Sequence, residues 1–248
     1  MSEEETYRPF PQQGRERLIL AAPVGRVGTG VPNPEPEMFE RLKQGGAVFM
    51  MGDNPQLPQM PDRPQLMDFF RLRFEDITVR HLLGSGKAAL DAGLDEKIVL
   101  ACLLHDISNG CLIRSDHGYW GAQMIAPYVD EEVVFAVQYH QALRYFADEA
   151  VGYSYPVNYD RFFGADFAVP DYMVRDAEIA RKHRWYMSAR QVTLFDTYFF
   201  DQQTANVDPA IFTDIIGRHF KTPKEGLGFD GSPAAHMWRT MIWPNNFL

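Results

Sequence analysis

Proline is distributed very unevenly along this 248-residue chain, and this limits where a core can form. Ten of the 17 prolines lie in the first 64 residues. Proline lacks a backbone donor and fixes φ, so at this density it does not continue helices or central strands. Residues 1–62 are therefore predicted to form an irregular extension that wraps over a helical domain of residues 63–248.

From residue 62 onward the apolar residues follow a helical spacing. Asp62 and Pro64 are typical of a helix start, and apolar residues then recur in steps of three and four on one face from Leu66 through Ile77 to Leu82. No convincing alternating pattern interrupts this region, so the predicted fold class is all-α. Further helices are predicted from Asp95 to Ile107, from about His117 to Tyr128, from Asp130 through Leu143, from Pro170 or Asp171, from about Ser188 to Phe200 and from Asp208 to about Phe220.

The composition excludes several classes of protein. Apolar residues make up 46% and charged residues 23%, which is typical of a globular chain. The longest apolar runs are far shorter than the roughly 20 residues of a membrane span, and no secretory signal is visible. Two cysteines do not form a disulfide framework, so a cytoplasmic location is expected. The net charge of −9 and the lack of a basic tract argue against nucleic acid as a partner. The expected partner is a small molecule.

Histidine is also distributed unevenly, since all seven histidines lie at or beyond position 81. Four of them fall on successive predicted helices near apolar faces. Burying so many imidazoles together with carboxylates is costly without partners, and a metal ion removes that cost. Imidazole and carboxylate together suit iron, manganese or zinc. The candidate metal ligands are His81, His105, Asp106, His117, His140 and Asp196.

The adjacent pair His105 and Asp106 carries a further prediction. Neighbours on a helix point about 100° apart, so they do not chelate one ion from one helix face. Both residues can bind metal if the carboxylate lies between two ions and gives one oxygen to each. The sequence therefore predicts a dinuclear site that Asp106 bridges.

The order H…HD…H…H…D resembles the HD-domain superfamily of metal-dependent helical enzymes, over roughly residues 66–200. Two longer motifs strengthen the resemblance: H-x-x-x-G-A-x-x-I from His117 and H-x-x-x-R-Y from His140. The resemblance implies that one ion is held by His81, His105, Asp106 and Asp196, and the other by Asp106, His117 and His140. Six-ligand sites occur in two branches of this superfamily. One resembles phosphohydrolases, and the other resembles inositol oxygenase and the phosphonate-cleaving oxygenases, which use a mixed-valent di-iron centre and dioxygen.

Spacing and context favour the oxygenase branch. The intervals of 24, 12, 23 and 56 residues resemble those of the phosphonate-cleaving oxygenases, apart from a shorter gap before His117. Ser108 and Asn109 follow the HD pair, where many phosphohydrolases and inositol oxygenase carry a lysine and the phosphonate oxygenases a histidine. Thr193 stands where the phosphonate oxygenases carry an arginine, which argues against a phosphonate substrate.

The expected function is therefore that of a mixed-valent di-iron oxygenase that cleaves or oxidises a small polar or anionic substrate. The first alternative is a metal-dependent phosphohydrolase that uses manganese or another divalent metal. The second alternative is a ligand sensor that is stabilised by metal and does not turn over. The sequence does not predict the oligomeric state.

Arg144 is the candidate substrate anchor and, with Asp106, a candidate catalytic residue. It lies one turn after His140 on the same helix face. A cation at that place could hold an anionic substrate beside the second metal. The alternative is a structural salt bridge with Asp148 or another nearby carboxylate.

Three further residues are candidates for contact with the substrate. Asn109 follows the HD pair closely, and Tyr153 and Tyr155 begin an aromatic segment, residues 153–172, between two predicted helices. Such a loop could close over a pocket. The alternative is aromatic packing on the outside of the bundle.

Overall fold

The fold is taken from a computed structural model, which describes residues 58, 61, 64–74, 76–110, 115–156, 164, 166–196 and 207–221. The predicted extension of residues 1–62 lies almost entirely outside these ranges. Within them helices are the only regular secondary structure, and one isolated bridge joins Asp148 to Tyr153. The prediction of an all-α fold is confirmed. None of the described helices combines the length and the apolar character that a membrane crossing requires.

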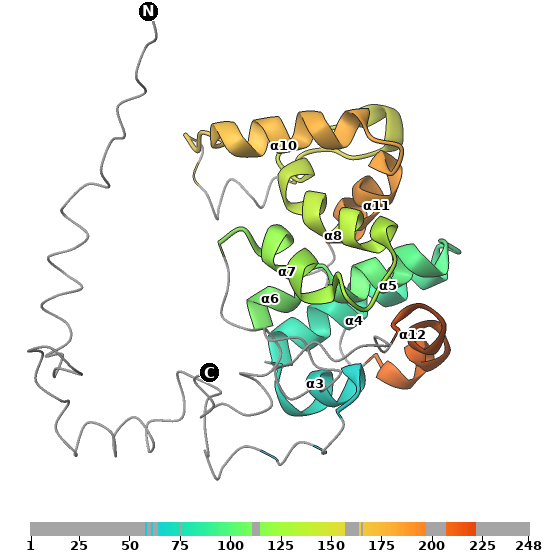
Figure 1. Ribbon diagram of the computed structural model, residues 1–248. Helices are drawn as coiled ribbons and strands as arrows, with labels where there is room; N and C mark the ends of the chain where they lie inside the picture. Colours follow the sequence, from blue (N-terminus) through green and yellow to red (C-terminus); the bar gives the residue numbers. More distant parts are fainter. Residues whose placement is uncertain are drawn as a thin grey trace, which may run out of the picture. The chain divides into compact units, whose positions relative to one another are not determined.

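Figure 1 labels the main helices. In chain order they are α3 (Leu66–Leu72), α4 (Asp76–Asp91), α5 (Glu96–Leu104), α6 (Ile107–Gly110), α7 (His117–Ile125), α8 (Glu131–Leu143), the 3₁₀ turn η1 (Glu149–Val151), α10 (Asp171–Lys182), α11 (Tyr186–Asp196), the 3₁₀ turn η4 (Pro209–Phe212) and α12 (Thr213–His219).

Helix α5 forms the centre of the larger core. Its residues 98–104 are all buried, because α4, α8, α11 and α12 pack around it (Figure 1). A helix that is apolar on every side is stable only inside a core. The N-cap residue Asp95 accepts a hydrogen bond from Lys97 N at 2.9 Å, which fixes where this helix begins.

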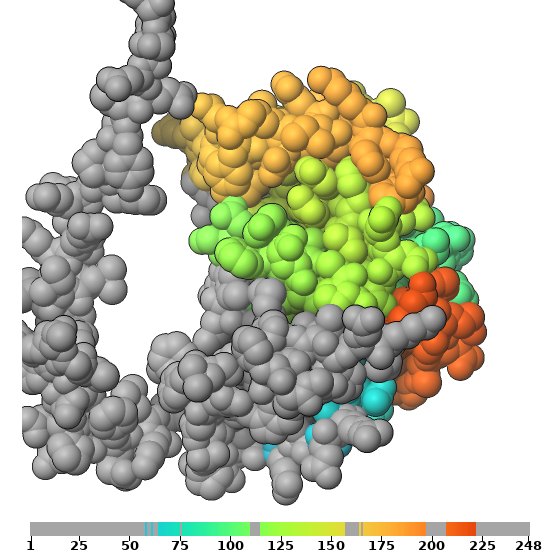
Figure 2. Space-filling view, viewed as in Figure 1, coloured from blue at the N-terminus to red at the C-terminus, as the bar shows by residue number. Residues whose placement is uncertain are grey.

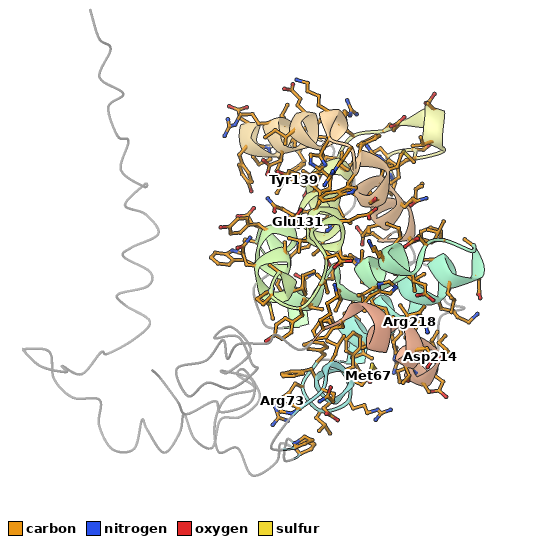
Figure 3. All side chains as sticks on the ribbon, turned by 45° about the vertical axis from the view of Figure 1, so that its right-hand side comes forward. Met67, Arg73, Glu131, Tyr139, Asp214 and Arg218 are labelled. Atoms are coloured by element: carbon orange, nitrogen blue, oxygen red, sulfur yellow. The ribbon has the colours of Figure 1, made fainter. Side chains whose placement is uncertain are left out.

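Helix α8 joins two parts of the bundle. One side packs in the larger core with Val133, Ala136 and Val137, and α7 and α11 pack against this helix as well. The other side meets α10 in a second cluster that includes Met173. Figure 2 shows α10 as the upper layer over α7 and α8, and Figure 3 labels Tyr139 on the face of α8 beneath α10. The last turn of α8 is therefore held between neighbouring helices.

The first predicted helix is divided. The spacing from Leu66 to Leu82 predicts one continuous face, but α3 ends at Leu72 and α4 begins at Asp76. The C-cap residue Arg73 is buried and its Nη1 donates to the carbonyls of Leu72 and Pro58, both at 2.8 Å. This break turns Ile77 outward, to 55% exposure, so its predicted place on the buried face is wrong.

The helix predicted from Asp95 to Ile107 is also shorter than expected, since α5 ends at Leu104. His105 and Asp106 lie in a turn between α5 and α6, not within a helix. The helix at His117 ends at Ile125, three residues before the expected end. The last helix begins as the 3₁₀ turn η4, in which Asp208 accepts a hydrogen bond from Ala210 N. The expected stretch beyond Asp196 lies outside the described residues.

Candidate metal centre

The structure brings all six predicted ligand residues together. They form two groups that could each hold a metal ion, and Asp106 belongs to both. Within each group the donor atoms lie within 4.8 Å of one another. The six residues are His81 on α4, His105 and Asp106 in the turn after α5, His117 at the start of α7, His140 in the last turn of α8 and Asp196 at the end of α11.

The first group is built around two imidazoles. The Nε2 atoms of His81 and His105 lie 2.9 Å apart. Asp196 Oδ1 lies 3.3 Å from the former and 3.2 Å from the latter. Asp106 Oδ2 lies 3.6 Å from His81 Nε2 and 4.0 Å from His105 Nε2. Two nitrogen and two oxygen atoms thus face a common point.

The second group uses the other oxygen of the same carboxylate. Asp106 Oδ1 lies 3.2 Å from His117 Nε2 and 3.6 Å from His140 Nε2. Among the described residues, neither Asp106 Oδ1 nor His140 Nε2 has a hydrogen-bond partner, although both atoms are buried. Buried polar atoms of this kind need a partner. A cation between them would provide it.

These separations match a shared metal ion better than a hydrogen-bond network. Nitrogen and oxygen ligands bind such ions at about 2.1 Å, so two donors on one ion lie about 3 to 3.5 Å apart. Most of the separations above fall near that range, and the longest exceed the usual length of a hydrogen bond. The residues therefore fit a metal centre of mixed imidazole and carboxylate character.

Backbone carbonyls orient two of the imidazoles. His105 Nδ1 lies 2.8 Å from the carbonyl of Cys102, and His140 Nδ1 lies 2.5 Å from the carbonyl of Val137. A carbonyl only accepts, so Nδ1 carries the proton in each ring and Nε2 of the neutral ring presents its lone pair to the site. Metal-binding histidines are commonly oriented in this way.

The electrostatics of the cluster favour a positive charge. Burial by itself lowers the pKa of His105, but Asp106 and Asp196 outweigh it and raise this pKa to about 9. For His117 burial dominates, and the pKa falls to about 4. The pKa of each of the two carboxyl groups lies well below its usual range, because the surrounding histidines outweigh the effect of burial. Two buried carboxylates thus remain ionised, and a metal cation balances them as well as protons do.

Arg144 lies at the edge of the cluster. Its Nη1 is 3.9 Å from Asp196 Oδ2, while Oδ1 of the same carboxylate faces the first group. Asp148, which is the alternative partner expected from the sequence, instead accepts a hydrogen bond from the Tyr186 hydroxyl. Arg144 and Asp106 have side chains that are 15% and 14% exposed, more than the other ligand residues. These two side chains are the most exposed of the cluster and of its edge.

The other predicted substrate contacts have different surroundings. Tyr153 is buried, and its hydroxyl donates to the carbonyl of Arg144 at 2.7 Å. Its side chain is therefore part of the packed interior and not of a surface loop. Tyr155 is half-buried two residues later, and Asn109 is half-buried on α6, three residues after Asp106. Their expected role in substrate binding stays a prediction.

Sequence reasoning missed two contacts that hold the ligands in place. Gln141 Oε1 accepts a hydrogen bond from Gly118 N at 3.0 Å, which ties the start of α7, beside His117, to α8. Ser85 on α4 donates to the carbonyl of Phe195 at 3.0 Å, directly before Asp196. Both are ordinary polar residues on helices. The one signal in the sequence is that Gln141 and Ser85 lie close to the ligand residues His140 and His81.

No protein-family model matches this sequence, and no curated protein shows significant similarity to it. Function is therefore inferred from the residues and their geometry.

Proposed function

We propose that this chain is a dinuclear metal-dependent enzyme of the HD-domain type, and that it is a di-iron oxygenase acting on a small polar or anionic molecule. The position of Asp106 is the observation that carries this proposal. Its Oδ2 faces His81 and His105, and its Oδ1 faces the other two histidines. A carboxylate placed in this way can hold two ions at once.

The composition of the ligand set supports iron. Four imidazoles and two carboxylates form a mixed set that suits iron, manganese or zinc, and we propose iron because an oxygenase needs a redox-active metal. When bound, the two ions would supply a redox-active centre able to use dioxygen. The residues of the chain would keep the pair together through Asp106 and exclude bulk water, because most of the ligand side chains are buried.

The residues after the HD pair add no positive charge to the site, so a side chain that phosphate-ester chemistry often uses is missing. The Ser108 hydroxyl donates to the carbonyl of His117 at 3.1 Å, so it supports the start of α7. Asn109 carries no charge. Phosphoryl-transfer sites commonly add cationic side chains to the charge of their metal ions. The ion pairs place one cationic side chain, Arg144, beside the cluster in the described part of the chain.

Arg144 is the residue we propose to orient the substrate. Its guanidinium contacts Asp196 of the four-ligand group, and in the sequence it follows His140 of the three-ligand group. An ion in the three-ligand group would have more coordination positions left for a substrate. A guanidinium binds a carboxylate or another anion through two parallel hydrogen bonds. An anionic substrate would then compete with Asp196 for Arg144.

The test is metal analysis and electron paramagnetic resonance on the full chain, purified without oxygen. The proposal expects two iron ions per chain and a spin-coupled mixed-valent signal after partial oxidation. The Asp106→Asn variant should lose this signal. Absence of iron, or iron that gives no such signal, would contradict the oxygenase proposal.

The alternatives predict different outcomes in parallel assays. A phosphohydrolase would release phosphate steadily from a panel of nucleotides with Mn²⁺, with or without dioxygen. A sensor would bind the metals and show neither dioxygen consumption nor phosphate release. Consumption of dioxygen that depends on an added anionic substrate supports the oxygenase.

A further inference from the structure

The last turn of α8 carries His140 and is followed directly by Arg144. The carbonyl groups at this end of the helix accept hydrogen bonds from side chains of other segments. The final carbonyl groups of a helix have few backbone partners; in α8 the His140 carbonyl accepts from Arg144 N and the Leu143 carbonyl from Phe146 N, both at 3.1 Å. Here three side chains from other segments donate to them. Arg190 Nη1 donates to the Leu143 carbonyl at 3.0 Å and the Tyr153 hydroxyl to the Arg144 carbonyl at 2.7 Å. The Thr193 hydroxyl shares its one proton between the His140 carbonyl at 3.2 Å and the Ala189 carbonyl of its own helix at 3.1 Å.

Arg190 is the least expected member of this set, because its guanidinium is fully buried. It lies over the ring of Tyr153 at 4.7 Å and over the ring of Tyr186 at 5.6 Å. Its Nε donates to the Tyr186 hydroxyl at 3.1 Å, and that hydroxyl donates to Asp148. Among the described residues, the carboxylate of Asp148 therefore acts on Arg190 through a hydroxyl rather than by a direct ion pair.

A buried guanidinium is costly, and packing alone does not explain it. Taking such a charge out of water costs several kcal/mol, and an apolar side chain of similar size fills space at lower cost. Among the described residues Arg190 Nη2 also has no hydrogen-bond partner. What arginine supplies here is a directed, charged hydrogen bond to the negative end of α8, where the helix dipole favours a cation.

The placement of Arg190 along α11 links it to the metal ligands. Thr193 follows it by three residues and Asp196 by six, all on the same helix. One helix thus carries both a ligand of the first group and two of the side chains that hold the last turn of α8. Any shift between the two helices would move His140 and Arg144 relative to Asp196.

We propose that Arg190 is a positioning residue for the metal centre: it holds the last turn of α8 so that His140 and Arg144 face the cluster. This inference rests on the proposed function, since it requires the cluster to bind two ions. Tyr153 and Thr193 serve the same purpose through their own bonds to the helix end.

The test compares Co²⁺ binding by the unaltered full chain and by its Arg190→Met variant. Binding is measured by calorimetry and by visible absorption. Loss of a direct hydrogen-bond partner of a metal ligand weakens affinity about 10- to 100-fold, and because Arg190 acts through the Leu143 carbonyl we expect a loss near the lower end of this range. We expect this loss for the ion of the second group, to which His140 belongs, with the first ion bound as before and the helical circular dichroism retained. Arg190→Lys, which keeps the charge, should restore part of the affinity. Arg184→Met is the matched control, because Arg184 is exposed and lies over Trp185 at 4.2 Å.

A second variant covers the case in which Arg190→Met does not fold. Tyr153→Phe keeps the ring under the guanidinium and removes only the bond to the Arg144 carbonyl, so it should also weaken the second ion. Unchanged Co²⁺ affinity in a folded Arg190→Met chain overturns the positioning role of Arg190. Where that chain does not fold, unchanged affinity in Tyr153→Phe overturns its premise, that side chains must hold the end of α8 for His140 to bind. Either result leaves the proposed function standing. Failure of the unaltered chain to bind two ions overturns both.

Discussion

Asp106 differs from the other five candidate ligands because its two oxygens face different histidines. The Asp106→Asn variant keeps the size of the side chain and replaces one oxygen by an amide nitrogen, which is a poor ligand. We expect both metal ions to be lost or strongly weakened, as measured by metal analysis after gel filtration. Asp91→Asn is the control, since Asp91 is exposed on α4 and pairs with Lys87. Two ions retained by Asp106→Asn would contradict the bridging role.

At Gly118 helix α7 lies directly against the backbone of α8. A Cβ at this position would lie 2.8 Å from the carbonyl oxygen of Gln138 and 3.1 Å from that of Val137. Gly118→Ala must therefore push the start of α7, with His117, away from α8. We expect a loss of about 1–3 kcal/mol in unfolding free energy, measured in urea, together with weaker binding of the second ion.

The control for this substitution is Gly217→Ala on α12. Gly217 is helical, and a Cβ there would meet nothing within 4 Å. Alanine is the better helix former, so this variant should gain about 0.5–1 kcal/mol. If both alanine variants changed stability in the same direction, close approach at Gly118 would not explain the effect.

At the residue scale the sequence revealed the candidate ligands and missed their supports. Histidine and aspartate stand out because few other roles account for several of them near apolar faces. Gln141 and Arg190 look like ordinary polar residues in the sequence. Their roles depend on which backbone groups the fold places opposite them, and a single sequence does not contain that information.

At the scale of elements, the sequence predicted where most helices lie but not where two of them break. Periodicity reports which residues face a core, and it continues across the boundary between α3 and α4. The break there depends on a distant contact, since Arg73 bonds the carbonyl of Pro58. The end of α5 at Leu104 has no local signal such as glycine or proline. It lies where the HD pair meets the other ligands.

The packing of α12 against the start of α5 gives a pH-dependent prediction. Hydrogen bonds from Arg218 and His219 lower the pKa of Glu96 to about 2. A carboxyl group whose pKa is lower in the folded state stabilises the fold above its unfolded pKa, and this contribution is lost as the pH falls through the folded value. The contribution of Glu96 should therefore be complete above about pH 4.5 and decline toward about pH 2.

The measurement is urea unfolding of the unaltered chain and of Glu96→Gln across this range. The difference between them should be small, because the pair is exposed, and it should shrink as the pH falls and as salt is added. Glu131→Gln is a close control: Glu131 is also the first residue of its helix, α8, and its side chain is exposed. An equal effect of both substitutions would mean that the helix dipole, not the contact with α12, is responsible.

For the whole molecule, the candidate ligands come from most parts of the helical core. They lie on α4, α7, α8 and α11 and in the turn after α5 (Figure 1). A bound ion would therefore connect segments that are far apart in the sequence. The binding energy of such an ion counts toward the stability of the whole bundle, because the unfolded chain does not present the same set of ligands.

Removal of metal should therefore lower the stability of the entire bundle rather than loosen one helix. A ligand present at 100 times its Kd stabilises the folded state by about 2.7 kcal/mol. We expect chelator treatment to lower the melting temperature, readdition of Fe²⁺ or Co²⁺ to restore it, and the shift to grow with the logarithm of metal concentration. Circular dichroism and tryptophan fluorescence should report the same transition, since the five segments unfold together.

The control is the Asp106→Asn chain, whose melting temperature should be the same with and without metal. A metal-dependent shift of equal size in that variant would place the stabilising ion outside the cluster, and separate transitions by the two probes would show that the ions hold only part of the bundle.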